Sequence, residues 1–226
     1  MRAVGHCSGA SLIRQVTAAC AVAVGLAGCG GGATEPIFNG RDLTGWSVSE
    51  GSSHGRTRSW HVEDGAIVAG QEPQGVGGIL LSTERYRDVE VSLEVWPDAG
   101  CDSGLLLRSN AQGQGYQVTI DYVDGGAVGS IYGEGLEGVE AEPNPAWVTA
   151  WRAGEWNELR ARIEGEVPRI TVWINGTPIT DWTDTANHAA GGAADGFIGL
   201  QVHGGDRWAR DGRIRFRNVR VRPASM

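Results

Sequence analysis

Several short segments of the chain place hydrogen-bonding side chains at every second position, with apolar side chains between them. Alternation of this kind puts the two sets on opposite faces of a β-strand. The polar positions are Arg108, Gln117, Thr119, Asp121, Tyr132, Gln201 and His203. Carboxylate, imidazole, guanidinium, amide and phenol groups together are a common set for holding a sugar. The pattern therefore predicts a carbohydrate site on one face of a sheet, the alternative being a polar face that is simply solvated.

The segments that would position these groups all have the patterns of β-strands. Asp64-Gly65 and Asn175-Gly176 predict two tight hairpins, the first within residues 60–69. The apolar phase slips near Arg217-Asn218, which predicts a β-bulge in the last strand, residues 213–221. Further strands are expected at residues 89–95, 104–108, 116–122, 128–132, 159–163, 170–174 and 197–202. Residues 134–151 predict a long loop, and no window has helical periodicity, so we expect an all-β sandwich.

The N-terminal segment has the features of an exported lipoprotein. Arg2 and Arg14 precede an apolar run at residues 16–26, which is shorter than the roughly 20 residues that span a bilayer. The run ends in Leu26-Ala27-Gly28-Cys29, which resembles the bacterial lipobox; the alternative is an ordinary signal peptide with a chance cysteine. We expect a signal peptide over residues 1–28, an acylated Cys29 and flexible tether over 29–35, and one domain over 36–226. The protein would be secreted and lipid-anchored in the bacterial cell envelope, with its membrane contact made through the N-terminal lipid.

Composition narrows the classes of function. The net charge is −8 and there is no basic block, which argues against nucleic-acid binding. Of the four cysteines, Cys7 and Cys20 would leave with the signal peptide and Cys29 would be acylated. Cys101 is then expected to pack in the core of the domain without a disulfide partner, the alternative being a nucleophile. Most of the nine Trp residues are expected in the core, and the excess favours stacking on sugars.

A series of motifs along the chain resembles one family. The motifs are FNGRDLTGW at residues 38–46, WHVEDG at 60–65, SGLLLR at 103–108, GYQVTID at 115–121, GSIYG at 129–133, GEWN at 154–157, NG at 175–176, IGLQVHG at 198–204 and FRNV at 216–219. In order and spacing they resemble the 3-keto-disaccharide hydrolase domain family, also described as 3-keto-glucoside 1,2-lyase/3-keto-2-hydroxy-glucal hydratase. The resemblance covers nearly the whole chain after the tether. It implies a concanavalin-like jelly roll of two antiparallel sheets, with a sugar bound across the concave face.

The resemblance also implies a chemistry, in which the partner is an oxidised, 3-keto sugar. The keto group acidifies the proton on C2; a base removes it, the C1 substituent leaves by elimination, and water can add back to give net hydrolysis. Asp121 is then the first choice for the base, His203 an acid or second base, and Glu94 a weaker candidate. Arg108 would stabilise the enolate or hold hydroxyl groups. The sugar would be oriented by Gln117, Thr119, Tyr132 and Gln201.

Three positions differ from the family pattern. The family often carries Glu directly after the Tyr of the Gly-Tyr motif and Gln two residues later, where this chain has Gln117 and Thr119, and Asp102 stands where Asn is common. Either catalysis rests on Asp121, or the domain is a non-catalytic carbohydrate-binding lipoprotein on the same fold. For Arg108, an ion pair with Glu94 is the alternative role.

No cofactor is evident from the sequence. His54, His61 and His188 lack the spacing of metal ligands, and the carboxylates form no calcium-loop pattern. A structural calcium ion is expected only by analogy with other jelly rolls.

Overall fold

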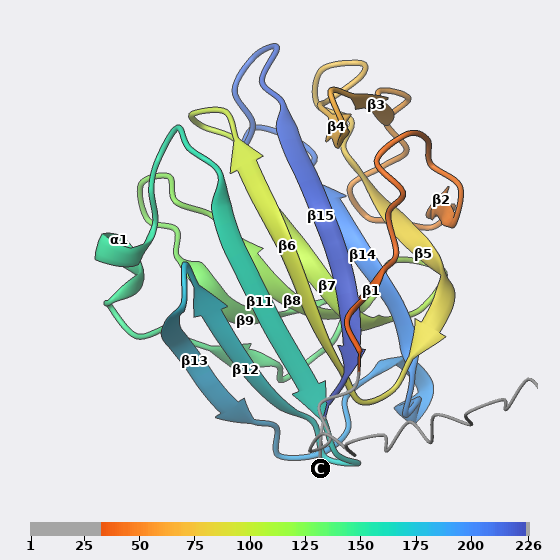
Figure 1. Ribbon diagram of the computed structural model, residues 1–226, viewed down its shortest axis with the longest axis vertical. Coiled ribbons are helices and arrows are strands. Elements are labelled where there is room, and N and C mark those ends of the chain that lie inside the picture. The colour runs from red at the N-terminus through yellow and green to blue at the C-terminus, as the bar shows by residue number, and fades with distance from the viewer. Residues whose placement is uncertain (1–32, 225–226) are drawn as a thin grey trace, which may run out of the picture. The chain divides into compact units, whose positions relative to one another are not determined.

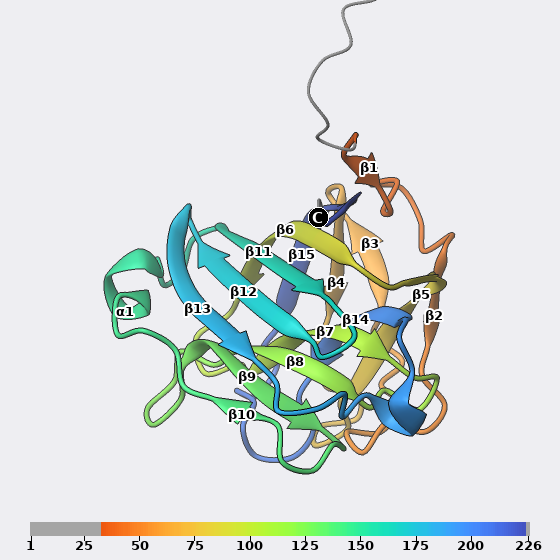
Figure 2. The same cartoon turned by 90° about the horizontal axis from the view of Figure 1, so that it is seen from below.

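The computed structural model describes residues 33–224, which form two β-sheets packed as two layers (Figures 1 and 2). The eight-stranded sheet, sheet A, has the strand order β13-β12-β11-β6-β15-β4-β3, with β1 paired to β15. Its strands are β13 (Thr177–Thr183), β12 (Arg169–Ile174), β11 (Asn157–Glu164), β6 (Val89–Pro97), β15 (Ile214–Pro223), β4 (Ala66–Ala69), β3 (His61–Glu63) and β1 (Glu35–Pro36).

The seven-stranded sheet, sheet B, has the strand order β10-β9-β8-β7-β14-β5-β2. Its strands are β10 (Glu140–Ala141), β9 (Val128–Glu134), β8 (Gly115–Ile120), β7 (Ser103–Ser109), β14 (Gly196–Val202), β5 (Gly78–Tyr86) and β2 (Trp46–Val48). Neighbouring strands in both sheets are antiparallel. The predicted all-β sandwich of two antiparallel sheets is therefore confirmed.

The core lies between the two sheets and follows the alternation of the sequence. On β6, Val91, Leu93 and Val95 are buried, and on β8 the buried set includes Tyr116 and Val118. Each such side chain contributes roughly 1.5–3 kcal/mol through its removal from water. Because every second residue of β8 points into this core, Gln117 and Thr119 must point to the opposite face of sheet B.

The predicted turns and bulge are confirmed. Asp64 and Gly65 have φ values of 50° and 77°, and Asn175 and Gly176 have φ values of 49° and 80°. Positive φ at both central residues is the geometry that a two-residue hairpin needs, and Asn, Asp and Gly adopt it at least cost. In β15 the pairing with β6 shifts register between Arg217 and Arg220, where the bulge was expected.

The prediction of a long loop over residues 134–151 is wrong in part. Glu134 belongs to β9, because the pairing of β9 with β8 continues past Tyr132 to the pair of Glu134 with Gly115. Residues 140–141 form the edge strand β10, and α1 (Trp147–Ala150) is one short helical turn. The Asn144 side chain accepts a hydrogen bond from the backbone N–H of Ala146 at 2.9 Å, which starts this turn. A second short turn, the 3₁₀ helix Ala190–Gly192, precedes β14.

Two loops at one end of sheet B lie against each other and carry side chains onto its outer face, the face that points away from sheet A. They are residues 49–60, between β2 and β3, and residues 203–213, between β14 and β15. The first loop is fixed where Gly77 N–H donates to His54 O at 2.8 Å. The second is fixed by the Gln71 amide, which donates to the backbone oxygens of His203 and Gly205 at 2.7 and 2.8 Å.

The predicted signal peptide and lipidated Cys29 lie outside the residues that the structure describes. Within residues 33–224, no helix is long and apolar enough to cross a membrane.

Candidate functional site

A pocket of about 410 Å³ opens on the outer face of sheet B. Its floor consists of two side-chain amides on strands β8 and β14. Gln117 Nε2 donates to Gln201 Oε1 at 3.0 Å, and Gln201 Nε2 donates back to Gln117 Oε1 at 3.3 Å. The two amides meet across β7 because Gly104 lies there, and a Cβ at that position would overlap the Gln117 side chain. Both glutamines are buried, so their orientation is fixed by this pairing.

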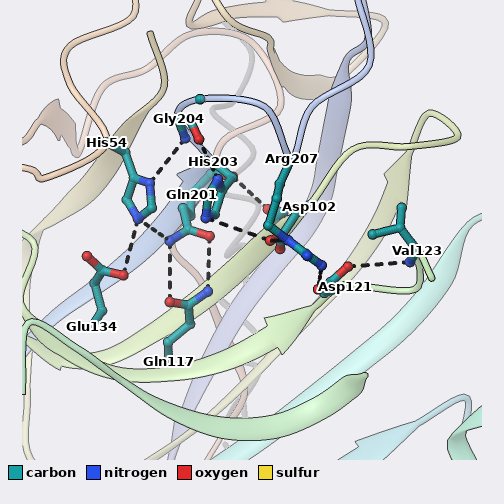
Figure 3. Close-up of polar contacts among 12 residues, drawn as sticks. His54, Asp102, Gln117, Asp121, Val123, Glu134, Gln201, His203, Gly204 and Arg207 are labelled. Carbon is teal, nitrogen blue, oxygen red and sulfur yellow. Dashed lines mark hydrogen bonds and ion pairs between the residues drawn. The ribbon is translucent and has the colours of Figure 1, made fainter. Parts of the chain in front are cut away.

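One wall of the pocket is a group of charged side chains at the ends of β7, β8 and β14 (Figure 3). Asp102 directly precedes β7, Asp121 follows β8, and His203 follows β14. Arg207, from the β14–β15 loop, donates through Nε to Asp102 Oδ2 at 3.1 Å and through Nη2 to Asp121 Oδ2. One guanidinium therefore serves two carboxylates. His203 Nε2 lies 3.8 Å from Asp102 Oδ2.

The opposite wall is made by Glu134 at the end of β9 and by the β2–β3 loop. Ser53 Oγ donates to Glu134 Oε1 at 2.7 Å, and His54 Nε2 lies 3.1 Å from Glu134 Oε2. Gln201 contacts the same His54 nitrogen at 2.9 Å, so this wall is joined to the floor. Burial opposes ionisation of Glu134, but the hydrogen bonds from His54 and Ser53 outweigh it and lower the pKa of that carboxyl. Glu134 is thus an ionised carboxylate whose position is fixed by Ser53 and His54.

The two histidines of the pocket carry their protons on different nitrogens. The backbone N–H of Gly204 donates to His54 Nδ1 at 3.1 Å, so the proton of neutral His54 is on Nε2, directed at Glu134. Gln201 Nε2, 2.9 Å from this nitrogen, is then in contact with it without donating a hydrogen bond. His203 Nδ1 donates to Gly204 O at 2.6 Å, so Nε2 of neutral His203 carries a free lone pair. Both nitrogens of His54 are therefore engaged, whereas His203 keeps one nitrogen free to accept a proton.

Burial also shifts the proton affinities on the charged wall. It lowers the pKa of His203, and the neighbouring His54 adds to this effect. Burial, together with the charge of Asp121, raises the pKa of the Asp102 carboxyl to about 7, despite the contact with Arg207. At neutral pH this wall therefore presents a neutral imidazole beside a carboxyl that is partly protonated. Such a pair can both accept and donate protons near the same pH.

Six residues predicted from the sequence come together in this pocket: Gln117, Thr119, Asp121, Tyr132, Gln201 and His203. Cys101 is fully buried, and burial raises the pKa of its thiol to about 11, which fits a packing residue better than a nucleophile.

Glu94, predicted as a weaker catalytic candidate, does not lie in this pocket. Glu94 lies on β6 in sheet A, where it accepts hydrogen bonds from Arg217 at 2.6 Å and from Asn218 at 2.6 Å. The hydrogen bond from Arg217 lowers the pKa of this carboxyl. Alternation identified the polar face of β6 correctly, but that face belongs to the sheet that does not carry the pocket.

Arg108, predicted to stabilise the enolate or hold hydroxyl groups, does not lie in this pocket either. Arg108 has a φ of 48° at a point where the pairing of β7 with β14 shifts register, so its side chain does not follow the outward direction of Leu106. Its guanidinium is fully buried and donates to Asp88 at 3.0 Å and to Gly165 O at 2.9 Å. The alternative ion pair with Glu94 is likewise not formed, since Arg108 pairs with Asp88. Arg108 joins two turns of the sandwich and takes no part in the pocket.

Five lining residues were not predicted: Ser53, His54, Asp102, Glu134 and Arg207. Glu134 follows the Ser130–Tyr132 alternation by one more step, so extending that strand by two residues would have found it. Ser53, His54 and Arg207 come from loops, whose paths the periodicity of the sequence does not define.

No group of three or more His, Cys, Asp or Glu side chains within residues 33–224 is arranged to hold a metal ion. The calcium ion expected by analogy stays a prediction.

Comparisons with known proteins agree with the fold. The chain is similar to a curated protein of Bacteroides thetaiotaomicron named 3-keto-disaccharide hydrolase, with 24% identity over 82% of this chain and 77% of the relative. A β-glucanase of Bacillus licheniformis superposes with a TM-score of 0.57 at 14% identity, covering 87% of this chain and 99% of the other. A carbohydrate-binding module of family 66 from Bacillus subtilis gives a TM-score of 0.52 at 18% identity, covering 80% and 96%. These two structures identify the sandwich as the predicted jelly roll.

The motif series has a counterpart in one family model. The model matches residues 33–222, which is nearly the whole described domain and includes both walls and the floor of the pocket. The chain therefore belongs to the family of 3-keto-alpha-glucoside-1,2-lyase-like domains.

Proposed function

We propose that this protein cleaves 3-keto-glycosides by removal of the C2 proton and elimination of the C1 substituent, followed by addition of water. The observation that carries the proposal is the charged wall of the pocket. There the free Nε2 of His203 faces Asp102, whose pKa is raised to about 7, and Arg207 lies beside both groups. The family and the name of the curated relative support the choice of substrate.

In the proposed reaction, His203 Nε2 takes the proton from C2 of the sugar. The electron pair of that C–H bond forms the C2–C3 double bond of an enolate, and Arg207 stabilises the negative charge on the C3 oxygen. The enolate then collapses, the C1–O bond breaks, and protonated Asp102 gives its proton to the leaving oxygen. Water adds across the resulting double bond, which restores a sugar hydrated at C1.

The other residues of the pocket hold the sugar. Asp121 fixes Arg207 by sharing its guanidinium with Asp102, so it acts on the reaction through Arg207. This differs from the sequence-based expectation that Asp121 is the base. Gln117, Gln201 and Thr119 offer hydrogen-bond donors and acceptors to the sugar hydroxyls, and Glu134 adds a carboxylate from the neighbouring strand. The carboxylate that the family pattern places at position 117 is thus replaced, in the same pocket, by one at position 134.

The test is cleavage of a 3-keto-disaccharide in D₂O, followed by NMR. Elimination exchanges the C2 hydrogen, so we expect deuterium at C2 of the released product; direct hydrolysis keeps hydrogen there. The His203→Gln variant should lose about 100- to 10,000-fold in kcat. A matched control is His61→Gln, because His61 is exposed on β3 and lies outside this pocket. Release of sugar with hydrogen retained at C2 would exclude the elimination.

The similarity to a carbohydrate-binding module supports a second candidate, binding without cleavage. This candidate predicts calorimetric binding of unmodified disaccharides, together with no sugar release and no deuterium exchange from the 3-keto form. The same preparations therefore decide between the two functions.

We also propose that the protein acts as a lipoprotein of the bacterial cell envelope, acylated at Cys29. The support is the sequence Leu26-Ala27-Gly28-Cys29 at the end of an apolar run. Expressed in a bacterial host, the full chain should enter the detergent phase on Triton X-114 partitioning, and Cys29→Ala should move it to the aqueous phase. Cys20→Ala, within the apolar run, is the matched control. Wild-type protein in the aqueous phase contradicts the proposal.

A further inference from the structure

The sides of the pocket differ in how far they are closed, so a bound ligand can extend more easily on one side than on the others. On the β14 side the rings of His54 and His203 lie 4.6 Å apart and close the space above Gln201. Along the strands, Glu134 bounds one end and Arg207 the other (Figure 3). On the remaining side, toward β9, the lining consists of Thr119 and Tyr132.

Tyr132, on this last side, is unusually exposed for an aromatic residue. It pairs with Gln117 of the floor on one side and with Glu140 of the two-residue edge strand β10 on the other. Its side chain points out of sheet B, and the residue is 53% exposed; among the large hydrophobic residues of 33–224 only Val148 is more exposed. An aromatic ring that borders a polar pocket and packs against little protein has a free face. The C–H face of a sugar ring stacks well on such a surface.

The chemistry places the reacting sugar away from Tyr132. His203, Asp102 and Arg207 lie at the ends of β14 and β7 and in the loop after β14, so C1, C2 and C3 of the substrate must lie there. The histidine rings block extension on that side. The side toward β9, lined by Thr119 and Tyr132, is the one without a histidine ring or a charged end wall, so we expect the rest of the substrate to extend over it.

We propose that Tyr132 forms the subsite for the leaving group, and that this leaving group is a sugar ring stacked on the exposed phenol face. The inference rests on the proposed function, since it uses the direction of the elimination. A disaccharide whose 3-keto sugar lies against the charged wall would then extend its second ring over β9 and β10. Tyr132 then determines specificity for the leaving group and leaves the chemical step to the charged wall.

The experiment compares two substrates, a 3-keto-disaccharide and the methyl 3-keto-glucoside, which lacks the second ring. We expect Tyr132→Ala to reduce the ratio of kcat/KM for the disaccharide over that for the methyl glycoside by about 3- to 10-fold. Most of this loss should appear in KM for the disaccharide. Tyr132→Trp should keep the ratio. The matched control is Val167→Ala, a residue 46% exposed on the β11–β12 turn, which should leave the ratio unchanged.

An unchanged ratio of kcat/KM in Tyr132→Ala, with or without an equal loss for both substrates, overturns the proposal. If the wild-type protein cleaves neither substrate, the proposed function fails, and the subsite is judged by calorimetric binding of the unoxidised disaccharide and methyl glucoside. A 3- to 10-fold selective weakening of disaccharide binding by Tyr132→Ala, on the order expected for an aromatic stack, then supports the subsite. Equal binding of the disaccharide to both proteins rejects it.

Discussion

Two charged clusters, one around Glu90 on sheet A and one around Arg207 on the outer face of sheet B, hold the same kinds of residues in opposite proportions. On sheet A, the buried carboxylate of Glu90 contacts three guanidinium groups: Arg162 at 2.8 Å, Arg222 at 2.7 Å and Arg160 at 3.5 Å. Burial opposes its ionisation, but the hydrogen bonds from Arg162 and Arg222 outweigh it, and the pKa of Glu90 is lowered. On sheet B, two carboxylates share the single guanidinium of Arg207, and the pKa of Asp102 is raised to about 7.

Burial opposes ionisation of both carboxylates, and the balance of charges around each then decides whether its pKa falls, as for Glu90, or rises, as for Asp102. An excess of arginine keeps Glu90 ionised at every pH near neutrality, so its network serves as a structural ion pair. An excess of carboxylate leaves Asp102 short of positive charge, and its proton becomes exchangeable near pH 7. The sequence contains candidate acids on both faces, and only their surroundings separate them.

The largest effect should come from removing Arg207, the one arginine among residues 33–224 that lines the pocket. Arg207→Met deprives the developing enolate of its stabilising charge, so kcat/KM for a 3-keto-disaccharide should fall about 100- to 1,000-fold. The matched variant on sheet A, Arg217→Met, breaks an ion pair of similar exposure with Glu94 and should change kcat/KM by less than about twofold. Equal losses in the two variants would contradict the contrast between the faces.

The second effect concerns the pH dependence of stability. The folded pKa of Asp102, about 7, exceeds its ordinary value of 3.8, so the folded protein binds more protons than the unfolded chain between these pH values. The stability of the wild type is therefore penalised progressively as pH rises from about 4 to about 7. Asp102→Asn removes the titrating group and should gain on the order of 2–4 kcal/mol relative to the wild type across this range. Urea unfolding at pH 4.5 and pH 8 measures the difference in unfolding free energy between the variant and the wild type. A difference that is larger at pH 4.5 than at pH 8 would contradict the prediction.

The third effect has the opposite sign, on sheet A. Glu90→Gln leaves three partly buried guanidinium groups without their carboxylate and should lower the free energy of unfolding by about 2 kcal/mol at pH 8. The lowered pKa of Glu90 means that its contribution is present above the ordinary pKa of 4.5 and is lost as pH falls. The destabilisation should therefore shrink in acid, while cleavage activity stays near that of the wild type. A destabilisation that is constant with pH would argue against the ion-pair origin.

The smallest effect tests the neutral floor between the two walls. Gly104→Ala introduces a methyl group where the Gln117 side chain lies, and so separates the Gln117–Gln201 pair. Loss of one or two hydrogen bonds to the sugar should raise KM about 3- to 10-fold with little change in kcat. Gly154→Ala is a comparison for a glycine substitution outside the pocket: its Cβ would meet open space, and the strain at its φ of 75° should lower stability without changing KM. An equal rise in KM for both variants would exclude a specific role for the floor.

The fold was predictable because its signals are local. Alternation in β6 and β8, the Asn175-Gly176 turn and the phase slip at Arg217-Asn218 each act over a few residues. The floor of the pocket was predictable for the same reason, since Gln117 and Gln201 follow from alternation alone. Alternation cannot tell which of two sheets a polar face belongs to, and this is why Glu94 was misplaced.

The rest of the site depends on information that periodicity does not contain. Arg108 does not lie on the expected face because its own positive φ turns its side chain away from the direction of Leu106. The alternation of the preceding leucines does not predict that change. His54 and Arg207 reach the pocket through loops, and their positions are set by contacts with Gly204, Asp102 and Asp121. The roles of His54 and Arg207 could be recognised only once the positions of the charged groups around them were known.

The hydrogen bond from Gly204 to His54 has a consequence for how the protein matures. It joins residues 150 positions apart in the chain, and the contact of Gln201 with His54 spans 147 positions. Contacts between such distant segments form late in folding, because the entropy of closing so long a loop must be overcome first. A chain emerging from a ribosome or a secretion channel therefore cannot assemble this pocket until almost all of it has been delivered. The pairing of β1 with β15 closes an even longer loop, from Glu35 to Val221, so activity during refolding should appear only together with the completed sheets.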